Sequence, residues 1–93
     1  MQLVFNAPLR AAEHGRATIH LVDLPDELAD YLNDLPLARH GFGSIKVEAG
    51  IGATTWKTSL FPSGQTFILL IARKLIAREN LTLGRPIEIT LEI

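Results

Sequence analysis

The chain has 93 residues, enough for one domain with a single core. Its net charge is −1, whereas a dedicated nucleic-acid binder usually carries a basic excess because phosphate contacts supply most of its affinity. Cysteine is absent, which excludes disulfides, thiolate metal sites and thiol nucleophiles and suits a reducing cytoplasm. No signal peptide is visible from Met1 to Arg10, and the longest apolar run, Phe67 to Ala72, is too short to span a bilayer.

The chain is unusually apolar for its length. Hydrophobic residues make up 47% of it, and its mean hydropathy is +0.22. Some of this apolar surface can be buried between subunits rather than within one, so a homodimer is one expected state.

The first half reads as strands around one helix. Strands are predicted from Gln2 to Leu9 and from Ala17 to Val22, with a polar turn from Arg10 to Gly15 between them. Pro25 to Leu35 has leucines at helical spacing, with Pro25 at the start, so it predicts a short amphipathic helix. Ser44 to Ala49 alternates polar and apolar residues and predicts a half-buried strand.

The second half repeats this order. Gly50 to Gly52 is predicted to be a hairpin turn, and Thr54 to Phe61 a strand ended by Pro62. Thr66 to Ile71 is an apolar run that predicts a strand buried on both faces. A helix follows from Ala72, with a left-handed cap at Asn80. The last predicted elements are a turn at Gly84 and a strictly alternating strand from Ile87 to Ile93.

The repeated pattern predicts a mainly β fold. Two similar halves, about 1–50 and 51–93, each contribute three strands and a helix within a single domain, 1–93. Each half would cover the other's open strand edge. The predicted product is a closed or nearly closed six-stranded barrel of the double-split type, capped by two short helices.

The first candidate site lies on the strand that carries Trp56, Thr58 and Ser59. Trp56 and Thr58 share one face of that strand, and Lys57 and Ser59 the other. A tryptophan at a barrel mouth can stack on a planar or apolar ligand, with Thr58 or Ser59 donating hydrogen bonds. The alternative is that Trp56 fills the core and its indole N–H binds a backbone carbonyl.

A second candidate is the only basic cluster, which, with Lys57 nearby, could contact nucleic acid or another polyanion. The alternative is a solvated helix face, partly neutralised by Glu79. The cluster consists of Arg73, Lys74, Arg78 and Arg85.

Other motifs point to no chemistry. His40 to Lys46 resembles a phosphate-binding loop only in its glycines, and it precedes a strand, so a plain turn is expected. His14, His20 and His40 lack the close spacing of zinc ligands, and no acid–base pair or G-x-S-x-G motif is present. We therefore expect no metal, no cofactor and no catalytic residue.

A longer string of residues carries a family resemblance. It runs through Trp56-Lys57-Thr58-Ser59-Leu60-Phe61-Pro62, Gly64, Phe67, Leu69, Leu81, Gly84 and Ile87 to Glu92, with Leu24-Pro25 and Gly41-Phe42-Gly43-Ser44 upstream. In these residues the chain resembles the family known as domain of unknown function 1905. Its second half is also similar to the hairpin module of AbrB-type regulators, whose dimers form double-split barrels on DNA.

The resemblance implies a fold rather than an activity. The chain differs from the family's usual pattern at Ala72 and near Ile76, where the family has lysine and arginine, and at Arg85, near which it has an acid. The leading expectation is a non-enzymatic module that binds a small molecule or a protein near Trp56. The alternative is a nucleic-acid-associated regulator of the AbrB type.

Overall fold

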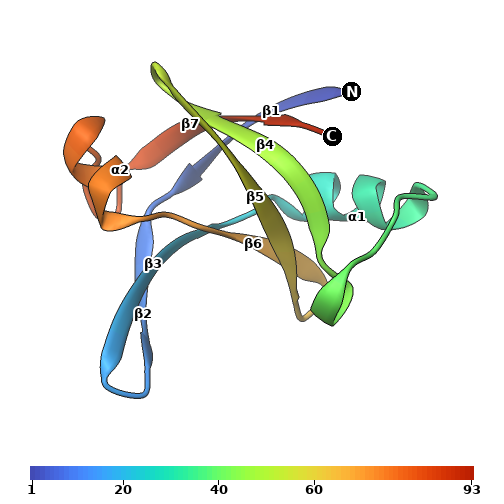
Figure 1. The fold of residues 1–93 in the computed structure, drawn as a ribbon, viewed down its shortest axis with the longest axis horizontal. Coiled ribbons are helices and arrows are strands. Elements are labelled where there is room, and N and C mark those ends of the chain that lie inside the picture. The colour runs from blue at the N-terminus through green and yellow to red at the C-terminus, as the bar shows by residue number, and fades with distance from the viewer.

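The computed structural model describes all 93 residues and is dominated by antiparallel strands, so the predicted mainly β class is confirmed (Figure 1). The chain forms seven strands, two α-helices and one short 3-10 turn, η1. In chain order these are β1 (Gln2–Pro8), β2 (Arg10–His14), β3 (Ala17–Asp23), α1 (Asp26–Asp34), η1 (Gly41–Gly43), β4 (Ile45–Ile51), β5 (Thr54–Ser63), β6 (Thr66–Leu70), α2 (Arg73–Arg78) and β7 (Pro86–Glu92).

The strands form one strongly curled sheet, a half-barrel, in the order β1-β7-β4-β5-β6-β3-β2. Its two edge strands, β1 and β2, follow each other directly, with only Leu9 between them. The Leu9 N–H donates to the Arg85 carbonyl at 3.2 Å, and the Leu9 carbonyl accepts from the Gly84 N–H at 2.8 Å. Leu9 therefore prolongs the pairing of β1 toward β7, and beyond it β2 pairs with β3 instead.

The predicted closed six-stranded barrel is wrong. There are seven strands, and the edge strands β1 and β2 are not paired with each other. The difference arises at Arg10 to Gly15, which was predicted as a turn, whereas Arg10–His14 is strand β2. Most of its side chains are exposed on both faces, so the alternation that marks a half-buried strand is missing.

The β2–β3 hairpin projects from the rest of the molecule (Figure 1). At its base the Arg10 guanidinium binds the Asp23 carboxylate, with Nε to Oδ2 at 2.5 Å and Nη2 to Oδ1 at 3.0 Å. These hydrogen bonds lower the pKa of Asp23 below its ordinary value of 3.8. Both side chains remain more than 40% exposed, so solvent screens the pair.

Strand β5 pairs with a different neighbour along each part of its length. It pairs with β4 from Thr54 to Leu60 and with β6 from Phe61 to Ser63. The prediction that Pro62 ends this strand is wrong, since Pro62 pairs with Phe67 of β6. Proline is tolerated here because β4 no longer accompanies the strand, so the missing N–H removes no ladder bond on that side.

Nineteen buried apolar residues form the core enclosed by the curled sheet. Helix α1 contributes Ala29 and Leu32, and α2 contributes Leu75. The alternation predicted for the last strand is confirmed, because β7 turns its apolar residues inward: Ile87, Ile89 and Leu91.

Strand β6 is not buried on both faces as predicted. Phe67 and Leu69 are buried, but Ile68 is half-buried and Leu70 is 39% exposed. The apolar run thus supplies the core with one face and leaves apolar surface on the other. On that second face, Leu70 lines a surface hollow.

The hairpin between β4 and β5 is tighter than predicted. Gly50 and Ile51 belong to β4, and the turn consists of Gly52 and Ala53. Gly52 has φ +56°, a left-handed conformation that favours glycine. It also lies against Glu79 at the end of α2, whose Oε2 accepts a hydrogen bond from the Thr54 hydroxyl at 2.7 Å.

Both predicted helices are present within a residue or two of their expected ends, α1 with Pro25 as its N-cap. Asn80 has φ +53°, which confirms the left-handed cap, and the Leu81 N–H donates to the Ile76 carbonyl at 2.9 Å. No helix of the chain has both the length and the apolar character needed to cross a membrane.

Candidate functional site

Trp56 and Thr58 line an open hollow of about 400 Å³ between β3, β5, β6 and the start of α2. More than half of the nine lining residues are apolar, and the rest carry hydroxyl, imidazole or guanidinium groups. Such a mixture is typical of small-molecule sites. The lining residues are Thr18, Ile19, His20, Trp56, Thr58, Leu70, Ile71, Ala72 and Arg73.

Trp56 is only half-buried and does not plug the core. Its strand register places it beside the buried Ala49 of β4, and its ring packs against the edge of the core. Its indole N–H takes part in none of the side-chain hydrogen bonds of the chain. Because no fully buried side-chain nitrogen or oxygen lacks a partner, the N–H keeps some contact with solvent, and the expected alternative, a bond to a backbone carbonyl, is not seen.

Other polar groups of the hollow are also free. The Thr58 hydroxyl and the His20 ring take part in none of the side-chain hydrogen bonds of the chain, and Arg73 has no ion-pair partner. Thr18 differs, because its hydroxyl donates to the Glu13 carboxylate at 3.0 Å. The hollow thus combines apolar walls with one hydroxyl, one imidazole, one indole N–H and one guanidinium that are available to a ligand.

A neighbouring hollow of about 390 Å³ extends this surface. It shares Thr18, His20 and Arg73 with the first hollow and continues to Ile76 and Ala77 on α2. The two hollows adjoin, and we call them together the Trp56 groove. Trp56 lines the first hollow, Ile76 the second, and Arg73 both.

Ser59 does not belong to this groove. It lines a different hollow, together with Lys46, Glu48, Lys57 and Glu92. The alternation of strand β5 turns Ser59 to the opposite face of the sheet from Trp56, while Thr58 borders both hollows.

The four residues of the basic cluster are all exposed, but they do not share one surface hollow. Arg73 lies in the Trp56 groove, whereas Arg85 lines another hollow with Glu79 and Glu88. Lys74 and Arg78 remain on the open side of α2. Carboxylates beside Arg85 weaken the attraction that this part of the cluster could exert on a polyanion.

The glycine loop uses its backbone donors internally. The Gly43 N–H donates to the His40 carbonyl at 2.9 Å, and the Ser44 N–H donates to the Gly41 carbonyl at 3.2 Å. These N–H groups are therefore not directed at an anion. Phe42, between the two glycines, has φ +59° and is 95% exposed.

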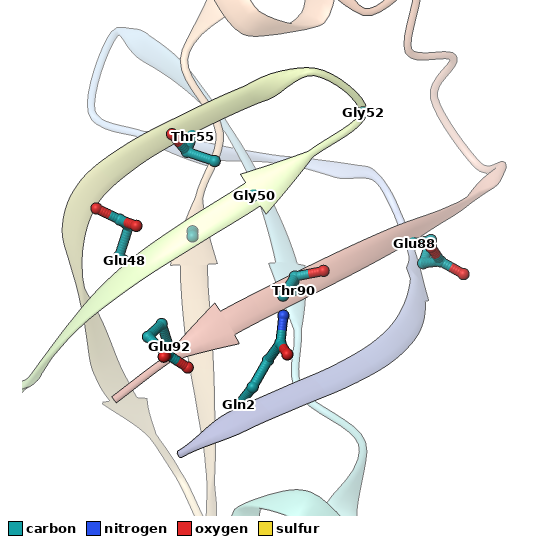
Figure 2. A pocket seen from close by; sticks show the side chains of 9 residues that line it. Gln2, Glu48, Gly50, Gly52, Thr55, Glu88, Thr90 and Glu92 are labelled. Carbon is teal, nitrogen blue, oxygen red and sulfur yellow. The ribbon is translucent and has the colours of Figure 1, made fainter.

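The outer face of β1, β7, β4 and β5 carries an acidic hollow of about 380 Å³ (Figure 2). Glu48 and Glu92 lie opposite each other on neighbouring strands, and Gly50 and Thr90, which have no or small side chains, line the hollow beside them. No three His, Cys, Asp or Glu side chains of the chain converge closely enough to hold a metal ion. The carboxylates here are solvated, and His14, His20 and His40 lie in different elements.

Several groove residues were not predicted from the sequence, notably His20 and Leu70. They come from strands that are distant in the chain, and β3 meets β6 through the pairing of Leu21 to Asp23 with Ile68 to Leu70. The Ile71 N–H extends this contact by donating to the His20 carbonyl at 2.8 Å. The local sequence gives one signal: His20 interrupts an otherwise apolar stretch of β3.

The chain is a small, mainly β domain. It combines a curled antiparallel sheet with two short helices and has an open groove beside its single tryptophan. The family model for a domain of unknown function, DUF1905, matches residues 5–91, nearly the whole chain. The chain therefore belongs to the DUF1905 family, as the resemblance in its sequence indicated. No curated protein matches the chain.

Proposed function

We propose that this domain is a non-enzymatic binding module that holds a small apolar or planar ligand in the Trp56 groove. One observation carries the proposal: the half-buried indole of Trp56 lines a mostly apolar hollow, and its N–H has no hydrogen-bond partner in the chain. Tryptophan N–H groups normally find a partner when they become buried, so a ligand that covers this one would gain by accepting a hydrogen bond from it.

The neighbouring groups support the same proposal. Ile19 and Leu70 offer apolar surface that water solvates poorly, and the Thr58 hydroxyl can orient a polar atom of the ligand. A hollow of about 400 Å³ is within the range of small-molecule sites. A protein partner inserting one apolar side chain would use the same contacts.

Fragment binding followed at Trp56 tests the proposal. The chain has a single tryptophan, so its fluorescence and its indole N–H signal in NMR report on one place. A fragment collection should contain members that shift both signals. If none does, and the N–H exchanges as slowly as core amides, the proposed site does not exist.

Thr58→Val and Ser59→Ala form a matched pair of variants for any fragment that binds. Thr58→Val removes a hydroxyl that lines the groove, and a lost hydrogen bond of about 0.5–1.5 kcal/mol should weaken binding roughly two- to tenfold. Ser59→Ala removes a hydroxyl on the opposite face and should leave affinity unchanged. Equal effects of the two would place the ligand elsewhere.

We also propose that the two halves of the chain are structural repeats. The first half runs β1, β2, β3, α1, β4 and the second β5, β6, α2, β7, so β1 and β2 together stand where the second half has the single long strand β5. In addition, β3 pairs with β6 just as β4 pairs with β7. Superposition of residues 1–50 on 51–93 tests this. The cytoplasmic location and the homodimer stay predictions, which fractionation and light scattering can examine.

A further inference from the structure

The Trp56 groove contains one full charge, and it is positive. Arg73 lies at the junction of its two hollows, is exposed, and has no ion-pair partner in the chain. No carboxylate lines either hollow. The carboxylate of Glu13 accepts a hydrogen bond from the hydroxyl of Thr18, which lines both hollows. The chain as a whole has a net charge of −1, so this groove differs in sign from the molecule around it.

Apolar surface lies on both sides of that charge. Trp56, Ile19 and Leu70 line the hollow on one side, and Ile76 and Ala77 line its continuation on α2. A wholly apolar ligand would leave the guanidinium beside it partly desolvated and unpaired, which is unfavourable. An anionic group at Arg73 would instead gain charge-assisted hydrogen bonds. His20, which lines both hollows, adds a further donor beside it.

We propose that the ligand of the Trp56 groove is an amphipathic anion, with an apolar or aromatic body against Trp56 and an anionic head group at Arg73. This inference rests on the proposed function, and it adds the chemical class of the ligand. The Thr58 hydroxyl and the indole N–H orient the body of the ligand, and Arg73 selects for the charge.

The test compares 3-phenylpropionate with its uncharged amide, 3-phenylpropanamide, which has nearly the same shape. Both are titrated into the protein while the Trp56 fluorescence and indole N–H signal are followed. The acid should bind about two- to fivefold more tightly than the amide at low salt, the range expected for a solvent-exposed charge pair. That preference should shrink as salt is added, because mobile ions screen the head group.

Two neighbouring cations of α2 provide the matched variants. Arg73→Gln should abolish the preference for the acid, whereas Lys74→Gln changes the net charge equally but lies outside the groove and should preserve it. Glu13→Gln should strengthen binding of the acid slightly, since it removes a like charge near Thr18.

The outcomes separate the two proposals. Equal affinity for acid and amide, or equal effects of Arg73→Gln and Lys74→Gln, overturns the anionic class while leaving a ligand site at Trp56. No response to the acid up to its solubility limit also overturns the anionic class, even if uncharged fragments still shift the Trp56 signals. If neither probe nor any fragment shifts those signals, the proposed function fails as well.

Discussion

Replacing Gly52 with alanine tests how the β4–β5 hairpin is attached to helix α2. Gly52 has φ +56°, and a Cβ atom built on it would lie 2.8 Å from Cδ of Glu79, with a carboxylate oxygen closer still. The left-handed conformation costs an alanine about 1 kcal/mol. The Glu79 side chain can swing away, but it then loses the hydrogen bond from Thr54, which contributes about 1–2 kcal/mol at this half-buried position.

Gly52→Ala should therefore lower the free energy of unfolding by about 2–3 kcal/mol. For a domain of this size that corresponds to a fall in Tm of roughly 10–20 °C, measurable by calorimetry and by urea titration. The matched control is the same substitution in a Glu79→Ala background. There the steric conflict is absent, so only the conformational cost of about 1 kcal/mol should remain. An equal cost in both backgrounds would show that Glu79 does not pack on this turn.

Three further outcomes are expected. Asp23→Asn should lower stability by up to about 1 kcal/mol at neutral pH in chemical denaturation, because it removes an exposed ion pair. Arg10 lowers the pKa of Asp23, so the wild type should exceed Asp23→Asn in free energy of unfolding by the full amount above the ordinary pKa of 3.8. This difference between the two proteins should shrink as the pH falls below 3.8, and a constant difference down to pH 2 would contradict the reasoning. Leu69→Ala should cost about 2–5 kcal/mol by leaving a core cavity, whereas Leu70→Ala on the open face should cost less than about 1; similar costs would mean that the assigned faces of β6 are wrong. Phe42→Gly should raise the free energy of unfolding by up to about 1 kcal/mol, and Tm slightly, because Phe42 has a left-handed backbone and its side chain is 95% exposed. A fall in Tm would reveal a stabilising contact of the Phe42 ring.

Local patterns in the sequence predicted most elements of the fold. The strict alternation of β7 and the leucine spacing of α1 each reflect one buried face, so they are readable without any knowledge of neighbours. Strand β2 has no buried side chain and only one that is half-buried, so it left no such signal. Its strand geometry follows from pairing with β3, a tertiary effect that composition does not encode.

The candidate site was only partly predictable for the same reason. Alternation along β5 placed Trp56 and Thr58 on one face of the strand and Ser59 on the other, yet all three were expected to serve one ligand site. In the structure Trp56 and Thr58 line the groove, whereas Ser59 lines a different hollow that Thr58 also borders. The partners of Trp56 in the groove, His20 and Arg73, come from β3 and α2, and only the order of strands in the sheet brings them to it. The sequence thus suggested one wall of the groove but not its opposite wall or its charge.

The projecting β2–β3 hairpin also makes the chain easy to modify. Its tip, from His14 to Ala17, is exposed, and a Cβ atom at Gly15 would meet no other atom within 4 Å. A short epitope or fluorophore-bearing peptide inserted after Gly15 should therefore be accommodated without disturbing the folded body. Such a label would give the molecule an optical reporter independent of its single tryptophan.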